Sequence, residues 1–432
     1  RTWPGPGMLG PMWDVAVVGS GPAGATAAIA ARRAWPQARV LLLDRADFPR
    51  DKSCGDGVAP HVLDVLERLG VTGLLADWPS VQRLRLCFPE GPEIGGVMRR
   101  GVYVVPRTVL DTRIRAAALD RGVEAVRHRV RRVEVAPDRV VLDDRLEARV
   151  VVGADGAHSV VRSAIGADPA SARQAIALRA YAPVIGLPSD EQLIVFERDA
   201  RWPAYAWSFP IGDGRANVGY GEFLPPGGKG RTPTRAQLVR RLHELLPGLR
   251  DPTALRGHHL PLSTAAVRQP DGPVLLAGDA LSLINPLTGE GIHTAVLTGA
   301  LAGIAAARAA RSAATGSGRS GAGPDPGREL RRALRGAFGR HTRDVNAMAH
   351  FARPRAVAAG LRGAQGRQRV FDDLVELGLA DGRITRRLLG VIVAELVRRA
   401  GRPFVAGPPG PGASAEGGGP GVGVPWSAEA MP

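Results

Sequence analysis

Apolar runs and glycines near the start of the chain alternate with the spacing of a β-α-β unit. The pattern predicts a strand over Trp13 to Val18, a helix over about Pro22 to Arg33, and a second strand over Val40 to Leu43 that ends in Asp44. Two consecutive strands joined by a helix lie parallel, with a right-handed crossover. The first part of the chain is therefore predicted to form a parallel sheet covered by helices.

Two further apolar strands are predicted at Val150 to Val152 and at Val274 to Leu276. The stretch between them, from about Ile176 to Leu262, has a different pattern. Runs such as Tyr205 to Phe209 and Asn217 to Tyr220 combine aromatic residues with turn signals, which is typical of antiparallel strands. We therefore expect an antiparallel sheet inserted into a nucleotide-binding type of domain.

The C-terminal part of the chain has helical periodicity from Arg328 to about Arg399. The segments Thr315 to Gly327 and Ala406 to Pro432 are rich in glycine and proline and are predicted to be unstructured. The alanine-rich run Ala295 to Ala307 is shorter than the roughly 18 apolar residues of a membrane span. We expect it to form a buried helix.

Charge and cysteine content exclude several classes of function. The net charge is +16, but Lys52 and Lys229 are the only lysines, and the arginines form no dense cluster interleaved with aromatic residues. Nucleic-acid binding is therefore not expected. Cys54 and Cys87 provide neither a disulfide framework nor a metal-ligand spacing, so we expect a cytoplasmic protein without a metal. A basic surface leaves open a peripheral location on anionic lipid.

The turn Gly19-Ser-Gly21-Pro-Ala-Gly24 has the spacing of a dinucleotide-binding turn. Gly19 permits a tight turn, Gly21 allows the backbone to approach a pyrophosphate, and Gly24 allows the helix and strand to pack closely. The N-terminus of the following helix faces the phosphate charge. Asp44 ends the second strand, where a carboxylate can bind ribose hydroxyls. The alternative is a glycine-rich turn without a ligand.

Two more glycine-containing motifs follow buried strands. One is Gly153-Ala-Asp155-Gly156, and the other combines Gly278-Asp279-Ala280 with the segment Asn285 to Ile292. Asp279 could accept hydrogen bonds from sugar hydroxyls, and the helix that begins at Ile292 would direct the positive end of its dipole at a ligand. Each motif alone is equally consistent with an ordinary loop aspartate.

Together the three motifs resemble the FAD fold of the para-hydroxybenzoate hydroxylase superfamily, over about Trp13 to Ala310. The resemblance implies that Asp279 contacts the ribityl chain of FAD and that Arg107, in Pro-Arg-x-x-Leu-Asp, also contacts the cofactor. For Arg107 the alternative is a surface ion pair with Asp111. The residues predicted to bind FAD are Gly19, Gly21, Ala23, Gly24, Asp44, Arg45, Cys54, Gly55, Gly57, Arg107, Val130, Asp155, Asp279, Pro286, Gly289, Gly291 and Ile292.

Further stretches resemble the geranylgeranyl reductase family within that superfamily. The segment Phe48 to Gly57 contains the family's Cys-Gly-Asp-Gly signature. The segments Pro203 to Pro210 and Gly219 to Gly221 match its Tyr-x-Trp-x-Phe-Pro and Gly-x-Gly motif. The stretch Phe371 to Arg387 is similar to the C-terminal region of actinobacterial members, which extends the resemblance to about Arg399.

Tyr205, Trp207 and Phe209 occupy alternate positions of a predicted strand, so their side chains share one face. Three such rings can line a long apolar cavity beside the flavin; the alternative is an ordinary aromatic core. The resemblance places Cys54 near the flavin ring, whereas its alternative role is that of a small buried hydrophobic residue. We predict Cys54, Tyr205 and Trp207 as catalytic residues.

The resemblance implies an FAD-dependent reductase that saturates carbon–carbon double bonds of a prenyl chain, in a geranylgeranyl lipid or a menaquinone side chain. The electron donor would be NAD(P)H or a ferredoxin-like carrier. The sequence does not identify the proton donor, and a water relay through Asp56 or His293 is one option. The alternative enzyme is a flavin-dependent monooxygenase acting on an aromatic or polyketide natural product, because the fold is shared. A third alternative is a non-catalytic flavin-binding or prenyl-lipid-binding protein.

A prenyl substrate would reach the enzyme from a bilayer, at the inner face of the cell membrane. The apolar run Leu388 to Val393 has arginines on both sides, and a basic amphipathic helix of this kind can lie on anionic headgroups. The alternative is a helix packed on the core. The flanking arginines are Arg383, Arg386, Arg387, Arg398 and Arg399.

The predicted fold class is α/β, with a Rossmann-like FAD-binding domain built on a parallel sheet, an inserted antiparallel-sheet substrate domain and a C-terminal helical region. The predicted boundaries are 12–75, 106–175 and 265–312 for the FAD-binding domain, 76–105 and 176–264 for the substrate domain, 313–327 for a disordered loop, 328–404 for the C-terminal helices, and 405–432 for a disordered tail.

Overall fold

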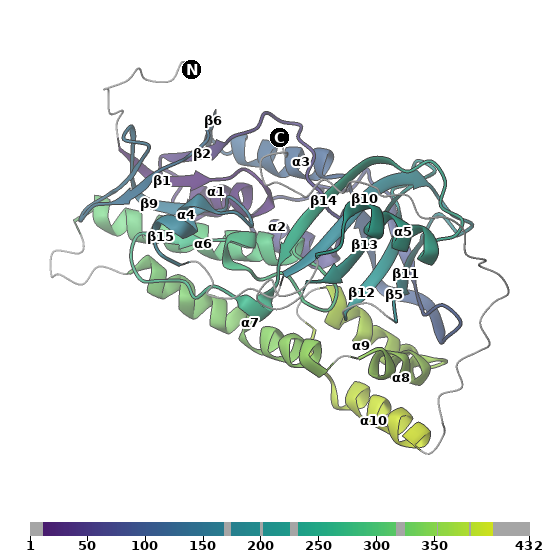
Figure 1. The fold of residues 1–432 in the computed structure, drawn as a ribbon. Coiled ribbons are helices and arrows are strands. Elements are labelled where there is room, and N and C mark those ends of the chain that lie inside the picture. Colours follow the sequence, from purple (N-terminus) through teal and green to yellow (C-terminus); the bar gives the residue numbers. More distant parts are fainter. Residues whose placement is uncertain are drawn as a thin grey trace.

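The computed structural model of the chain describes residues 12–167, 174–198, 202–224, 232–316, 325–351, 353–379 and 382–400. The two sheets lie beside each other, with long helices along one of them and the C-terminal helices below the other (Figure 1). The predicted α/β class with its C-terminal helices is confirmed. The predicted tail and the middle of the predicted disordered loop lie outside the described residues.

Sheet A is the nucleotide-binding type of sheet predicted from the sequence. Its strands follow the order β6-β2-β1-β9-β8-β7, with β15 paired to β9. The pairs β1–β2, β1–β9, β2–β6 and β9–β15 are parallel, which confirms the expected β-α-β unit. The pairs β7–β8 and β8–β9 are antiparallel, which the sequence had not predicted. The strands are β1 (Trp13–Val18), β2 (Val40–Asp44), β6 (Glu124–Arg127), β7 (Val133–Val135), β8 (Val140–Leu142), β9 (Leu146–Gly153) and β15 (Val274–Leu276).

Helices α1 and α6 pack closely under sheet A. A Cβ atom on Gly299 or Gly303 of α6 would overlap the backbone carbonyl of Ala23 or Ala27 in α1, so only glycine permits this approach. Helix α6 is long and apolar enough to span a membrane, but 67% of its most apolar window is buried inside the protein, as expected for a core helix. The helices around this sheet are α1 (Pro22–Ala34), α2 (Pro60–Arg68), α3 (Arg107–Leu119), α4 (Val160–Ala164), α6 (Ile292–Ala314) and α7 (Pro326–Phe351).

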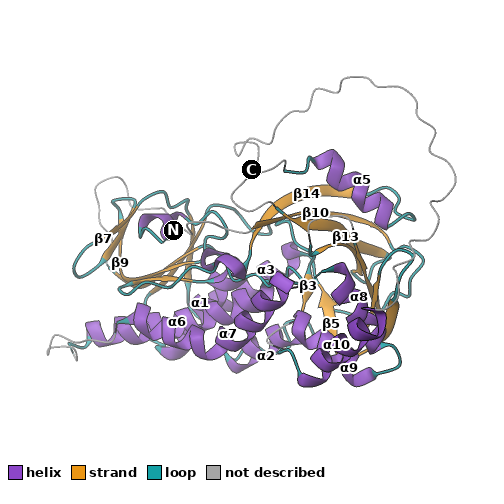
Figure 2. Cartoon of the chain, turned by 60° about the horizontal axis from the view of Figure 1, so that its bottom comes forward, coloured by secondary structure: helices purple, strands orange, loops and turns teal. Residues whose placement is uncertain are grey.

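Sheet B is the predicted inserted sheet, and Figure 2 shows its strong curvature. Its strands follow the order β14-β10-β13-β12-β11-β4-β5-β3. The sheet is antiparallel except where β11 pairs in parallel with β4, which departs from the antiparallel pattern expected from the sequence. Strands β4 and β11 belong to segments that are far apart in the chain. The strands are β3 (Gly57–Val58), β4 (Ser80–Cys87), β5 (Glu93–Val104), β10 (Gln174–Pro183), β11 (Glu191–Phe196), β12 (Ala204–Pro210), β13 (Arg215–Phe223) and β14 (Thr253–Pro261), with helix α5 (Arg235–Leu245) packed on β10 and β13.

The C-terminal helices are α8 (Pro354–Ala364), α9 (Gln368–Leu379) and α10 (Arg386–Ala400), and α8 and α9 pack on strand β5 of sheet B. Helix α10 lies outermost, on α8 and α9 (Figure 1). A single apolar cluster joins sheet B to these helices. It includes Phe209 of β12, Leu287 of the loop before α6, Phe371 of α9 and Leu388 of α10. The C-terminal region is therefore part of the same core as the predicted substrate sheet.

Candidate functional site

The first glycine-rich turn has the geometry expected of a phosphate-binding turn. Gly19 has φ +102°, and a Cβ atom on Gly24 would overlap the carbonyl oxygen of Gly19, so both positions require glycine. Gly21 is the N-cap residue of α1 and offers no side chain to cap the helix. The predicted residue Ala23 is buried next to Gly278, where a Cβ atom would lie 2.9 Å from that of Ala23. The turn therefore presents backbone amides that no side chain caps at the N-terminus of α1, which is the positive end of the helix dipole.

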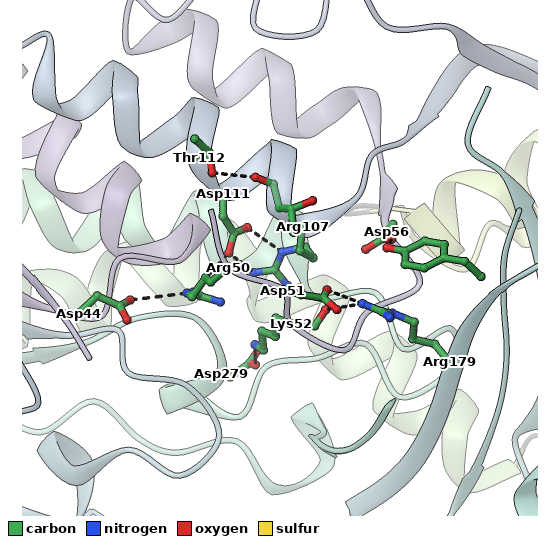
Figure 3. Close-up of polar contacts among 12 residues, drawn as sticks. Asp44, Arg50, Asp51, Lys52, Asp56, Arg107, Asp111, Thr112, Arg179 and Asp279 are labelled. Carbon is green, nitrogen blue, oxygen red and sulfur yellow. Dashed lines mark hydrogen bonds and ion pairs between the residues drawn. The ribbon is translucent and has the colours of Figure 1, made fainter. Parts of the chain in front are cut away.

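Two arginines lie beside this turn. A Cβ atom on Gly21 would lie 3.1 Å from Nη2 of Arg50 and 3.9 Å from Nη2 of Arg107. Arg107 is buried and donates to Asp111 from Nε at 2.7 Å and from Nη2 at 2.9 Å. Arg50 lies 3.3 Å from Asp111, which therefore links both cations (Figure 3). The ion pair predicted as the alternative for Arg107 exists, but it is buried rather than on the surface.

The surroundings of Arg107 keep its guanidinium group positively charged. Burial alone would favour the neutral form, but the Asp111 carboxylate outweighs it and raises the pKa of Arg107 above its usual value. Asp111 is fully buried, so the pair is shielded from solvent. A fixed positive charge beside a glycine turn is the complement of a pyrophosphate.

Asp44 ends β2 as predicted and lies at the same turn. One carboxylate oxygen accepts from the backbone amide of Ser20 at 2.8 Å, and the other from that of Ala46 at 2.9 Å. The side chain of Arg45 is exposed, whereas Val130 is buried behind β2 in the core of sheet A. Arg45 and Val130 remain predicted cofactor contacts.

The carboxylate of the predicted residue Asp155 is engaged in hydrogen bonds within the protein. It accepts a hydrogen bond from Ser159 Oγ at 2.5 Å and from the backbone amide of Val160 at 2.7 Å. These contacts cap the start of α4. The motif still lies against the first turn, because a Cβ atom on Gly19 would overlap the carbonyl of Ala154. A cofactor role for Asp155 stays a prediction.

Asp279 lies in a short 3-10 helix, η3 (Gly278–Leu281), directly after β15. Its Oδ2 accepts from Lys52 Nζ at 2.9 Å (Figure 3). Burial opposes ionisation of Asp279, but Lys52 outweighs it and holds the pKa of this carboxyl below its usual range. Burial and the nearby Lys52 ammonium lower the pKa of His258 to about 4, so this imidazole is neutral at physiological pH. The site therefore contains a charged Lys52–Asp279 pair beside a neutral His258.

The loop before α6 brings the cofactor motif into contact with sheet B and the C-terminal helices. The hydroxyl of Tyr205 donates to the carbonyl of Thr288, and a Cβ atom on Gly289 would lie 3.1 Å from that hydroxyl. The hydroxyl of Thr288 donates to the carbonyl of Gly378 at 2.8 Å. The predicted residues Pro286, Gly291 and Ile292 belong to this loop and the start of α6. Tyr205 is thus anchored to the loop that carries the predicted flavin contacts.

Glu290 directly precedes Gly291, the N-cap residue of α6, and its Oε1 accepts from the backbone amide of His293 at 2.6 Å. Burial raises the pKa of Glu290 to about 7. A carboxyl that is partly protonated near neutral pH therefore lies at the N-terminus of this helix. The sequence motif contained Glu290, but only the structure shows this environment.

Three aromatic rings of β12 form a row on one face of sheet B, as predicted. The ring centroids of Tyr205 and Trp207 are 6.1 Å apart, and those of Trp207 and Phe209 are 6.3 Å apart. A Cβ atom on Gly55 would lie 3.6 Å from Nε1 of Trp207 and 3.7 Å from the ring of Phe209. The Cys-Gly-Asp-Gly loop, with Gly57 at its end in β3, therefore lies directly against the aromatic row.

A buried polar network connects this loop to sheet B. Asn217 donates from Nδ2 to the carbonyl of Cys54 and to Oδ2 of Asp56, both at 2.8 Å, and accepts from Trp207 Nε1 at 2.9 Å. Tyr181 donates to the same Asp56 oxygen at 2.5 Å. Cys54 is half-buried, and burial raises the pKa of its thiol. The predicted catalytic residues Cys54 and Trp207 are therefore brought together, through Asn217.

Comparisons with known proteins identify the family. A family model described as "FAD binding domain" matches residues 12–315. A menaquinone reductase of Mycolicibacterium smegmatis is 34% identical over 312 residues, which cover 67% of this chain and 75% of the relative. Digeranylgeranylglycerophospholipid reductase 2 of Methanopyrus kandleri is 32% identical over 309 residues, which cover 67% and 76%. This chain belongs to the geranylgeranyl reductase family of FAD-dependent oxidoreductases.

The fold of this flavoprotein is shared with solved structures. A geranylgeranyl bacteriochlorophyll reductase-like protein from Thermoplasma acidophilum superimposes with a TM-score of 0.66 at 20% identity, covering 90% of this chain and 97% of the other. At that identity the match concerns the fold alone. FAD is the cofactor of this flavoprotein, as predicted.

The residues at the first turn fit the pyrophosphate of FAD. The start of α1 has no side-chain cap, the hydroxyl of Ser20 is buried without a hydrogen-bond partner among the described residues, and Arg50 and Arg107 lie beside Gly21. Unpaired donors and fixed cations are what a phosphate group requires. The donor set of this flavoprotein therefore matches its cofactor.

Four residues near the site were missed as site residues by sequence reasoning. Arg50 and Lys52 flank the Cys-Gly-Asp-Gly signature, and Lys52 had a signal, since it is one of two lysines in a chain rich in arginine. Asn217 and Tyr181 belong to neighbouring strands of sheet B, and their register decides that they meet Asp56. A single sequence does not contain that register.

Proposed function

We propose that this flavoprotein saturates carbon–carbon double bonds of a prenyl chain, in a geranylgeranyl lipid or in the side chain of a menaquinone. The observation that supports this most directly is the row of Tyr205, Trp207 and Phe209 against the Cys54 loop. A wall of aromatic rings suits a long hydrocarbon better than a polar aromatic substrate. The similarity to a menaquinone reductase and to a digeranylgeranylglycerophospholipid reductase supports the same substrate class.

Binding of FAD would use residues from both the first turn and the loop before α6. Gly21, Arg50 and Arg107 would hold the pyrophosphate, Asp44 the adenosine ribose, and Asp279 the ribityl chain. Lys52 keeps Asp279 ionised and would share its hydrogen bonds with the ribityl hydroxyls. Reduced FAD supplies the hydride when it is bound.

The residues of this chain would position the alkene and hold the proton that the reduction requires. The aromatic row would hold the prenyl chain against the loop of Cys54 and exclude water. Burial raises the pKa of Cys54, which keeps the thiol protonated at neutral pH and able to face the substrate carbon as S–H. Tyr205 would fix the flavin loop to the substrate sheet through Thr288. Cys54, Tyr205 and Trp207 are therefore proposed as the groups that contact the reacting chain.

We also propose that substrate enters from an anionic membrane through helix α10. Its exposed apolar side chains are spaced to share one face, and Arg386 and Arg398 border the same surface. One opposite residue, Leu388, is fully buried, so the helix both packs on the core and presents an apolar outer face. The exposed residues are Leu389 (52%), Val393 (50%), Leu396 (40%) and Val397 (69%).

The proposed reaction also requires an electron donor that reduces the bound FAD. A reduced nicotinamide cofactor and a ferredoxin-like carrier are the two candidates. Stopped-flow reduction of the bound FAD by each donor separates them, because only the physiological donor should reduce the flavin at a rate that matches turnover.

The experiment that tests the proposed reaction is mass spectrometry of prenyl lipids from cells with and without the gene. The proposal predicts a gain of two hydrogen atoms per reduced bond in one prenyl-lipid class when the gene is present. Identical lipid profiles in the two strains would contradict it. A product that carries added oxygen would instead support a monooxygenase.

A further inference from the structure

Asp56 is buried in a way that ordinary loop aspartates are not. It lies in the turn before β3, its residue is 0% exposed, and its backbone has φ +60°, which is uncommon outside glycine. Its carbonyl accepts a hydrogen bond from the amide of Val105 at 2.9 Å, which ties the turn to the end of β5. The main chain therefore fixes the carboxyl inside the protein.

The two carboxyl oxygens of Asp56 have unequal surroundings. Oδ2 accepts from both Tyr181 and Asn217, whereas Oδ1 is buried without a hydrogen-bond partner among the described residues. An ionised carboxylate would leave a charged oxygen buried and unsatisfied, which is costly. A proton on Oδ1 removes that charge. The geometry thus favours a neutral Asp56 that carries its proton on the unpartnered oxygen.

The polar and charged groups around Asp56 weaken this preference. Burial is the largest influence and raises the pKa of Asp56 to about 6, against the opposing effects of Tyr181, Asn217, Arg179 and Arg107. Asp56 is therefore mostly protonated below about pH 6, and roughly a tenth of it carries the proton at neutral pH. Arg179 is itself paired with Asp51. Cys54 is near enough for the Asp56 charge to raise the pKa of the thiol, and the Asp56 amide donates a hydrogen bond to the Cys54 side chain.

We propose that Asp56 stores the proton for the reduction and returns it to Cys54. The inference rests on the proposed function. Bound reduced FAD would supply the hydride to one alkene carbon, and the π electron pair would take the proton from Cys54 Sγ at the other. The thiolate then takes the proton of Asp56 through a bridging water, because Asp56 Oδ1 has no hydrogen-bond partner among the described residues, and the carboxylate regains a proton from solvent. Asp56 acts through Cys54 and is a positioning residue rather than a group in contact with substrate.

Infrared difference spectroscopy of the FAD-loaded protein tests the proton store without turnover. Between about pH 4 and about pH 8, a protonated-carboxyl band should titrate with a midpoint near the raised pKa of Asp56. Glu290 titrates in the same range, so the band is assigned by its loss in Asp56→Asn and its persistence in Glu290→Gln. A spectrum unchanged by Asp56→Asn would overturn the proposal.

Single-turnover reoxidation of the reduced flavin by prenyl substrate tests the transfer. Asp56→Asn should slow it roughly 100-fold, the lower range for loss of a proton-transfer group, and Asp56→Glu should restore part of the rate. If the wild type saturates the prenyl chain and Asp56→Asn does so at the same rate, the proton store is wrong while the proposed function stands. If the wild type does not saturate it at all, the proposed function itself fails.

Tyr181→Phe provides a second variant that keeps the carboxyl. Removing the Tyr181 hydroxyl takes a hydrogen bond from the ionised form of Asp56, so the pKa of Asp56 should rise. Both the infrared midpoint and the inflection of the rate–pH profile should then shift to higher pH together. An inflection that stays in place while the infrared midpoint moves would exclude Asp56 from the rate-determining proton transfer.

Discussion

The ring of Trp207 occupies the space above Gly219, its directly opposite neighbour on β13. A Cβ atom on Gly219 would overlap the indole carbons and the carbonyl of Leu178. This explains the spacing of the Tyr-x-Trp-x-Phe-Pro and Gly-x-Gly motif in physical terms. The glycine creates the room for the indole, and the indole then donates to Asn217 and contacts the Cys54 loop.

Gly219→Ala should therefore displace Trp207. We expect a loss of roughly 1–3 kcal/mol of stability, typical of overpacking, and a weakened prenyl-reducing activity. Urea unfolding of the FAD-loaded protein and single-turnover kinetics measure the two effects. Gly221→Ala is the matched control, because its Cβ atom would meet that of Ala177 at 3.3 Å and should cost much less. Equal effects of the two substitutions would contradict this account of the motif.

Asp279→Ala should release FAD. A lost hydrogen bond to a charged group costs about 1.5–3 kcal/mol, so FAD should bind roughly 10- to 100-fold more weakly. Equilibrium binding followed by flavin fluorescence measures the change. Asp271→Ala is the control, since Asp271 forms ion pairs with Arg328 and Arg331 instead. Full FAD affinity in Asp279→Ala would remove Asp279 from the cofactor site.

Glu290 should make stability depend on pH near neutrality. Its pKa rises from 4.5 to about 7 on folding, so the stabilisation is complete below about pH 4.5 and is lost as the pH rises through about 7. The loss amounts to at most about 3 kcal/mol, from 1.36 kcal/mol per unit. Glu290→Gln should therefore be more stable than the wild type at about pH 8, with a difference that narrows toward about pH 5. Urea unfolding at several pH values measures this, and a difference that does not vary with pH would refute it.

Helix α10 should bind anionic vesicles. Replacing Val393 and Val397 with aspartate places charge on the exposed apolar face and should abolish co-sedimentation with phosphatidylglycerol vesicles. The control is Val135→Asp, a substitution of an equally exposed valine on β7. Binding of the wild type should weaken as salt rises. No binding of the wild type at low salt, or equal binding of all three proteins, would contradict the docking proposal.

Much of the fold could be predicted because its elements have local signals. Strands β1 and β15 have the predicted bounds, and α1 and β2 differ by a single residue at one end, since apolar runs and glycines mark them directly. The parallel β4–β11 pair could not be predicted, because it joins segments that are distant in sequence.

The candidate site was predicted unevenly for the same reason. The motifs located Cys54, Trp207 and Asp279, but not the partners that set their environment. Lys52 beside Asp279 and Asn217 between Trp207 and Cys54 depend on tertiary contacts. The raised pKa values of Asp56 and Glu290 depend on burial, which a sequence pattern does not contain.

The most direct test of the central claim is a single turnover without oxygen. The FAD-loaded protein is reduced with dithionite under strict anaerobiosis and mixed with a geranylgeranyl lipid or a menaquinone in vesicles, and the product is analysed by mass spectrometry. The account predicts that flavin reoxidation accompanies a gain of two hydrogen atoms per reduced bond. A reduced flavin that ignores both substrates until oxygen is admitted, and then yields a product with one added oxygen atom, would contradict it.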